Sequence, residues 1–198
     1  MSTEKENKGS TVRVVLDAMG GDYGPSETVK GAMRALDADN IEIILVGDKD
    51  QVEAELANYD LAGKPVRIES SEGKIGDDEH PLQAIRSKPK SSILVANKVL
   101  KSGEADVLVS MGSTGASMAV AVLALGLLEG LDRPCIGGPF LGLAPRTVLV
   151  DMGSNIDCRP GMLLNFAVAL TVSHLTAPPP ERVQQMVENI RIPRASEG

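Results

Sequence analysis

Aromatic side chains are scarce in this chain, which has no tryptophan, two phenylalanines and two tyrosines. Its 198 residues are nevertheless 42% hydrophobic, which excludes a disordered chain and predicts a core of aliphatic side chains. Two cysteines and two histidines provide neither a disulfide framework nor the ligand spacing of a zinc site. We therefore expect a cytoplasmic, reducing environment and no bound metal or other cofactor.

Long hydrophobic runs and basic patches are also missing. The longest nearly uncharged stretches, residues 116–128 and 162–175, are shorter than the ~20 residues that span a bilayer and are better explained as buried helices. Acidic residues outnumber basic ones by 27 to 20, which argues against nucleic acid as a partner. Residues 1–10 are polar, so we interpret them as a disordered lead-in and not as a secretory signal.

The pattern of strands and helices predicts the fold class. β-branched runs at residues 11–17, 41–48 and 66–70 alternate with helical patterns at residues 27–38 and 50–59. This alternation predicts an α/β protein with a mainly parallel sheet. Further along, we expect a loop with one short helix at 71–90, a helix at 91–103, a strand at 105–110, the apolar helix, a strand at 146–152 and a helix from about residue 161.

The junction after the strand at 105–110 is the strongest candidate site, because ligands of parallel sheets bind at the carboxyl ends of strands. Ser110, Gly112, Ser113, Thr114 and Gly115 lie there, directly before the apolar helix. Hydroxyls, free backbone N–H groups and the positive end of a helix dipole together could bind a phosphate. Alternatively, Ser113 or Thr114 only caps the helix while the glycines form the turn. The segment matches neither a Walker sequence nor a dinucleotide fingerprint.

A second glycine-rich junction follows the first strand. Gly20 and Gly21 permit close approach of a ligand to the backbone, and Asp17 and Asp22 flank them. Two carboxylates would repel a phosphate unless a cation intervened, so a magnesium site is conceivable here. The alternative is that both aspartates stabilise turns by hydrogen bonds to the backbone.

Basic residues are concentrated in one segment, at Arg86, Lys88 and Lys90. An arginine is suited to hold a phosphate because its guanidinium can donate two parallel hydrogen bonds. The competing interpretation is a solvated charged loop. Cys158 follows a predicted strand, but we interpret it as a packing residue and not as an acyl carrier, because neither histidine lies near it in sequence.

Several longer motifs follow one another along the chain: residues 17–25 (DAMGGDYGP), 46–48 (VGD), 80–92 (HPLQAIRSKPKSS), 103–116 (GEADVLVSMGSTGA), 130–134 (GLDRP) and 150–158 (VDMGSNIDC). In their order and spacing they resemble the PlsX-type phosphate acyltransferases of bacteria. The resemblance implies a three-layer αβα sandwich similar to the phosphotransacetylases. It also implies transfer of a fatty acyl group from acyl carrier protein to inorganic phosphate, giving acyl phosphate for phospholipid synthesis.

The resemblance also suggests roles for the candidate residues. We expect Arg86, Ser113, Thr114 and Asn155 to be catalytic. The expected substrate-binding residues are Asp17, Gly20, Gly21, Asp22, Lys88, Ser110, Gly112 and Gly115. The expected partners are acyl carrier protein, inorganic phosphate, a second copy of the chain in a homodimer, and a downstream membrane glycerol-3-phosphate acyltransferase, which leaves peripheral membrane association open.

Members of this family are much longer than this chain, which affects the domain prediction. Residues 11–175 are predicted to form the N-terminal part of the acyltransferase domain, and the proline-rich residues 176–198 resemble nothing in the family. We therefore expect a truncated or frame-shifted product that is incomplete at its C-terminus and is inactive, prone to aggregate or dependent on self-association. Two alternatives remain, a non-catalytic module that binds phosphate or acyl carrier protein, and a phosphotransacetylase-like enzyme that uses acyl-coenzyme A.

Overall fold

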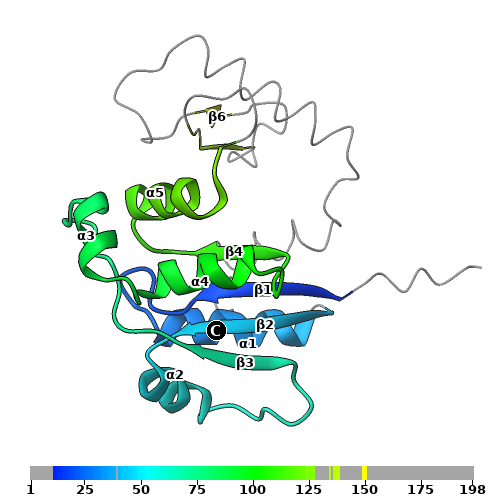
Figure 1. Ribbon diagram of the computed structural model, residues 1–198. Helices are drawn as coiled ribbons and strands as arrows, with labels where there is room; N and C mark the ends of the chain where they lie inside the picture. Colours follow the sequence, from blue (N-terminus) through cyan, green and yellow to red (C-terminus); the bar gives the residue numbers. More distant parts are fainter. Residues whose placement is uncertain (1–10, 39, 128–133, 135, 139–148, 151–198) are drawn as a thin grey trace, which may run out of the picture.

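The computed structural model describes residues 11–38, 40–127, 134, 136–138 and 149–150. Within them, strands and helices follow the predicted order (Figure 1). The strands are β1 (Val12–Asp17), β2 (Ile41–Gly47), β3 (Val66–Ser70), β4 (Val107–Ser110), β5 (Gly137–Gly138) and β6 (Leu149–Val150). The helices are α1 (Ser26–Ala38), α2 (Lys49–Leu56), α3 (Pro81–Ser87), α4 (Ser92–Lys101) and α5 (Thr114–Leu125).

Strands β1 to β4 form one parallel sheet in the order β3-β2-β1-β4. In this register Asp17, the last residue of β1, lies opposite Val46 on one side and Ser110 on the other. The carboxyl ends of these strands therefore meet at one edge of the sheet. The sheet confirms the predicted parallel α/β architecture.

Helices α1 and α2 cover one face of this sheet. Alternate strand residues, such as Val14 and Leu45, point to that face and pack against Val29 and Met33 of α1 and Val52 of α2. The buried hydrophobic residues described are all valine, leucine, isoleucine, methionine or alanine. The prediction of an aliphatic core is therefore confirmed for the described residues.

Helix α4 covers the opposite face, so the described part of the chain has three layers. Val15 and Ile44 of the sheet pack against Ala96 and Val99 of α4. A further cluster joins α3, α4 and α5 beside this layer, and Figure 1 shows α5 above β4, next to α4. The start of α4 and the start of α5 are thereby brought to the edge of the sheet where the strands end.

Helix α5 is less buried than its sequence suggests. Ala116 and Val120 are buried, whereas Leu123 and Leu125 are 61% and 51% exposed. The prediction of a helix buried on all sides is therefore wrong for the described part of this stretch. The reason is its position, since α5 packs on α3 and α4 along one side, and no second layer lies against it among the described elements.

Strands β5 and β6 pair with each other in antiparallel fashion. Strand β6 falls within the strand predicted at 146–152. The predicted helix from residue 161, the stretch 162–175, and both cysteines lie outside the described residues. Among the described residues, no helix is both long enough and apolar enough to cross a membrane.

Candidate functional site

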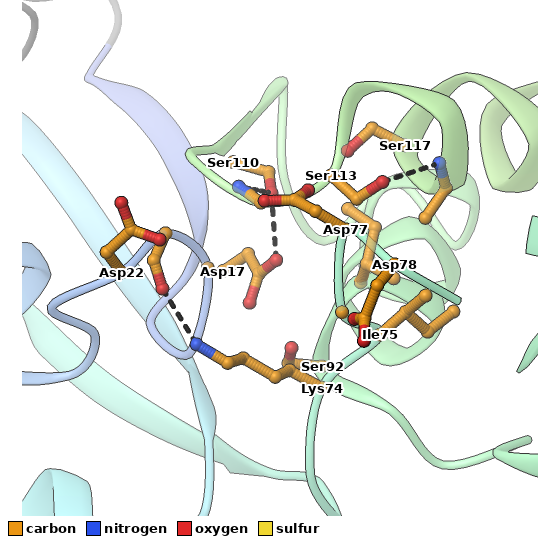
Figure 2. Close-up of a pocket in the computed structure, with 16 residues that line it drawn as sticks. Asp17, Asp22, Lys74, Ile75, Asp77, Asp78, Ser92, Ser110, Ser113 and Ser117 are labelled. Carbon is orange, nitrogen blue, oxygen red and sulfur yellow. Dashed lines mark hydrogen bonds between the residues drawn. The ribbon is translucent and has the colours of Figure 1, made fainter.

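A cavity of about 280 Å³ lies at the carboxyl ends of β1 and β4 (Figure 2). Four chain segments form it: the loop after β1, the loop before α3, the start of α4, and the junction of β4 with α5. Its lining residues are Asp17, Gly20, Gly21, Asp22, Lys74, Ile75, Gly76, Asp77, Asp78, Ser92, Ile93, Ser110, Gly112, Ser113, Ala116 and Ser117. The cavity thus brings together the two glycine-rich junctions that the sequence indicates separately.

A buried hydrogen-bond network connects these two junctions. The Ser110 hydroxyl donates to the Asp17 carboxylate at 2.8 Å, and the Gly112 N–H donates to the Ser110 hydroxyl oxygen at 3.1 Å. The second Asp17 oxygen accepts from the Met19 N–H at 3.3 Å. Since Asp17 is only 2% exposed, these bonds position both loops around the cavity.

The glycines at this edge allow the two loops to approach each other closely. A Cβ atom on Gly20 would lie 2.8 Å from the Gly112 backbone nitrogen, a distance that side-chain carbons do not adopt. Gly21 has a φ of 80°, in the left-handed region that favours glycine. The glycines after β1 are therefore required by the packing of the site itself.

The start of α5 contributes a capped helix end. Ser113 is the N-cap residue, and its hydroxyl oxygen accepts from the Ala116 N–H at 3.4 Å. Ser113 also lines the cavity, so it serves as a cap and remains a candidate ligand-binding residue. Thr114 is exposed and Gly115 faces Pro81 of α3, and neither is among the lining residues.

Among the described residues, the cation that lines the cavity is Lys74. Its ammonium donates to the Gly21 carbonyl oxygen at 2.7 Å and so links the loop before α3 to the loop after β1. Asp77 and Asp78 follow it in sequence and, like Asp22, are exposed to solvent. Lys74, Asp77 and Asp78 are not among the residues predicted from the sequence, where the run of acidic residues at 77–79 is the available signal.

The predicted cationic cluster lies outside the cavity lining. Arg86 is exposed on α3, and the Lys88 ammonium is 2.6 Å from the Glu79 carboxylate. That hydrogen bond, with a smaller contribution from the Gly76 N–H, lowers the pKa of Glu79. Lys90 pairs with Glu72 at 2.7 Å, and this hydrogen bond raises the pKa of Lys90.

The remaining predicted catalytic residue, Asn155, lies outside the described residues. A magnesium site after the first strand would need several oxygen ligands that converge on one point. Among those residues, no group of three histidine, cysteine, aspartate or glutamate side chains is arranged to hold a metal ion. The cavity instead combines hydroxyls, backbone N–H groups and helix starts, which are donors for an oxyanion.

Sequence comparison gives a family match over most of the chain. The model of a family described as fatty acid synthesis protein matches residues 12–179. A phosphate acyltransferase from Pelotomaculum thermopropionicum is 47% identical over 157 residues, which are 79% of this chain and 46% of that protein. One from Nostoc punctiforme is 50% identical over 164 residues, 81% of this chain and 48% of that protein. The chain thus spans about half the length of these relatives.

Comparison with solved structures identifies similar folds. A phosphotransacetylase from Streptococcus pyogenes has a TM-score of 0.56 and 19% identity, covering 81% of this chain and 52% of that one. A phosphotransacetylase from Staphylococcus aureus has a TM-score of 0.51 and 18% identity, covering 92% and 64%. These likenesses confirm the predicted phosphotransacetylase-like fold.

Proposed function

This chain belongs to the fatty acid synthesis protein family, and from this premise we propose that it acts as an acyltransferase on inorganic phosphate. The proposed donor is a fatty acyl thioester of acyl carrier protein, and the product is an acyl phosphate for phospholipid synthesis. The observation that supports this most directly is the cavity at the carboxyl ends of β1 and β4, where Ser110, Ser113 and the start of α5 meet.

The proposed reaction is a direct transfer without an acyl-enzyme. A phosphate oxygen attacks the thioester carbonyl carbon, so that a C–O bond forms while the C–S bond breaks. The sulfur leaves with the electron pair as a thiolate, and the proton that the attacking hydrogen phosphate loses passes through solvent to this thiolate. Because phosphate is already an anion at neutral pH, positioning and charge neutralisation supply most of the acceleration, each worth several kcal/mol in order of magnitude. We assign the positioning of phosphate to Ser113, which lines the cavity, and to Thr114 and Arg86, which lie outside its lining and would reach the ion from the rim. We assign a role at the reacting groups to Asn155.

The cavity is also lined by carboxylates, which would repel a phosphate anion unless their charge is screened or hydrogen-bonded. Asp17 already accepts two hydrogen bonds from the protein, whereas Asp22, Asp77 and Asp78 are exposed, where water and salt weaken their repulsion of an anion. Lys74 adds one positive charge at the same cavity. Phosphate at neutral pH also retains a proton, which can be donated to a carboxylate oxygen.

The proposed partners extend beyond the described residues. We propose acyl carrier protein as the donor, a homodimer as the assembly, and a membrane glycerol-3-phosphate acyltransferase as the enzyme that consumes the product. We place the reaction in the cytoplasm. The family relationship supports these assignments, and each needs its own measurement.

An acyl-transfer assay tests the function directly. The purified chain and, in parallel, a full-length relative are each mixed with phosphate and either an acyl–acyl carrier protein or an acyl-coenzyme A, and acyl phosphate is trapped as a hydroxamate. We expect product only with the carrier-protein donor and only when phosphate is present. Product from acyl-coenzyme A alone would indicate a phosphotransacetylase-like enzyme. Phosphate binding without product from either donor would indicate a non-catalytic module.

Replacement of Thr114 tests the location of the phosphate. Thr114→Val keeps the shape of the side chain but removes a donor, so phosphate binding should weaken about tenfold, as for loss of a hydrogen bond to a charged group. Calorimetric titration with phosphate measures this change. Unaltered affinity would remove Thr114 from the proposed site.

A further inference from the structure

The start of α4 contains a buried hydroxyl that no described group satisfies. Ser92, the first residue of this ten-residue helix, is 1% exposed, and its Oγ has no hydrogen-bond partner among the described atoms. A buried hydroxyl without a partner costs free energy, so its retention requires an explanation. Ser92 also lines the cavity, and in Figure 2 its hydroxyl is directed toward the space beside Asp17.

The protein backbone does not account for this hydroxyl. The Ser92 N–H donates to the Gly73 carbonyl oxygen at 3.1 Å, so the main chain at this position is satisfied while the side chain is not. The first hydrogen bond within α4 runs from the Val95 N–H to the Ser91 carbonyl oxygen at 3.0 Å. The earlier N–H groups of a helix have no acceptor inside it and are therefore available to an anion.

Neighbouring Ser91 also has a buried hydroxyl without a hydrogen-bond partner, but it has no access to the cavity. The residue is 0% exposed and is not among those that line the cavity. Ser91 is the N-cap residue of α4, yet its side chain makes no capping hydrogen bond. The two serines therefore differ in one respect that matters here, which is access to the cavity.

We propose that the Ser92 hydroxyl donates a hydrogen bond to bound inorganic phosphate, so that the ion lies between the start of α4 and the start of α5. This inference rests on the proposed function and adds a second helix start and a second hydroxyl to the phosphate site. The Ser92 hydroxyl and the N–H groups of a helix start are donors, and Lys74 adds a positive charge to the same cavity, which suits an oxyanion. Asp17, which also lines the cavity, already accepts two hydrogen bonds from the protein.

Two single substitutions, Ser92→Ala and the control Ser91→Ala, test the proposal. Each removes one buried, unpartnered hydroxyl, so the melting temperature without phosphate should stay the same or rise in both variants. Titration calorimetry with inorganic phosphate should show about tenfold weaker binding in Ser92→Ala, as expected for a lost bond to a charged ligand. Binding by Ser91→Ala should match the parental chain.

A third variant, Ser92→Thr, keeps the hydroxyl and should retain most of the affinity that Ser92→Ala loses. If phosphate binds the parental chain and Ser92→Ala equally well, Ser92 is not a phosphate donor, although the proposed function stands. Equal losses in the Ser91 and Ser92 alanine variants would likewise overturn the inference. If the folded parental chain does not bind phosphate at all, the proposed function and this inference both fail.

Discussion

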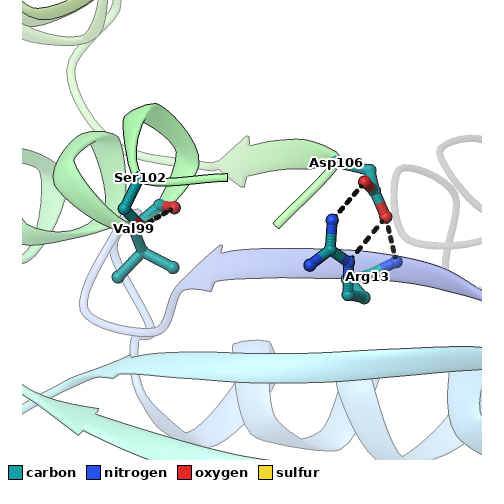
Figure 3. Close-up of polar contacts among 4 residues, drawn as sticks. All are labelled: Arg13, Val99, Ser102 and Asp106. Atoms are coloured by element: carbon teal, nitrogen blue, oxygen red, sulfur yellow. Dashed lines mark hydrogen bonds and ion pairs between the residues drawn. The ribbon is translucent and has the colours of Figure 1, made fainter. Parts of the chain in front are cut away.

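The two ends of strands β1 and β4 are joined by two different pairs of residues. At the amino ends, the Arg13 guanidinium forms a fork with the Asp106 carboxylate at 2.7 and 3.1 Å (Figure 3). At the carboxyl ends, Asp17 accepts a hydrogen bond from the Ser110 hydroxyl at 2.8 Å. Both pairs connect residues that are 93 positions apart in the sequence, so the comparison keeps strands and register constant.

The pairs differ in charge and in burial. The side chains of Arg13 and Asp106 are 39% and 47% exposed, and each has an oppositely charged partner. Asp17 is 2% exposed and bonds only to neutral groups, and it faces a cavity. A satisfied ion pair in water stabilises little and needs no ligand, whereas a buried carboxylate without a cation organises hydroxyls and loops. The carboxyl end thus holds a buried carboxylate beside the cavity where we propose that phosphate binds, whereas the amino end holds an ion pair that joins the two strands.

The largest expected effect comes from removing the buried carboxylate. Asp17→Ala leaves the Ser110 hydroxyl and the Met19 N–H without their acceptor, so the free energy of unfolding should fall by about 2–3 kcal/mol. Phosphate binding should be lost with the loop arrangement. Urea denaturation and calorimetric titration measure the two effects.

The control at the other end of the same strands is Asp106→Ala. We expect a smaller loss of stability than for Asp17→Ala and unchanged phosphate affinity, because this pair lies in solvent. If both alanine variants lose phosphate binding equally, the contrast between the two ends is not functional.

A smaller effect should follow from adding one methyl group where the two loops meet. In Gly20→Ala the new Cβ would contact the Gly112 nitrogen, and relieving this contact should cost about 1–3 kcal/mol and weaken phosphate binding several-fold. Gly31→Ala is the matched control, since a Cβ there has no neighbour within 4 Å and its helix should gain about 0.5–1 kcal/mol. Thermal melts with and without phosphate would contradict the packing argument if the two variants behaved alike.

The smallest expected effect is a pH dependence at the amino end. The side-chain hydrogen bond from Arg13, followed by its backbone N–H, lowers the pKa of Asp106. A depressed pKa in the folded state contributes stability that is present above the unfolded value of about 4 and is lost as the pH falls below it. Melting temperatures between about pH 5 and pH 2 should therefore fall more steeply for the parental chain than for Asp106→Asn. Parallel curves would show that the ion pair adds no net stability.

The order and type of the described elements follow from local patterns in the sequence. Runs such as residues 12–17 and 41–47 are β-branched and aliphatic, and the helices between them carry apolar residues three and four positions apart. Because these signals are local, the predicted boundaries agree with the structure to within a few residues. The rule that ligands bind at strand ends likewise points to Asp17 and Ser110, which the structure places in hydrogen-bond contact.

Which side chains share the cavity depends on tertiary packing and could not be predicted from the sequence. Lys74 lines it, whereas Arg86 and Lys88, which form the denser basic cluster in sequence, do not. Ser92 and Ser91 are adjacent identical residues, yet one hydroxyl faces the cavity and the other does not. The physical reason is that charge density and residue type are properties of the chain, whereas access to a cavity depends on how α3, α4 and the loop before α3 pack at the edge of the sheet.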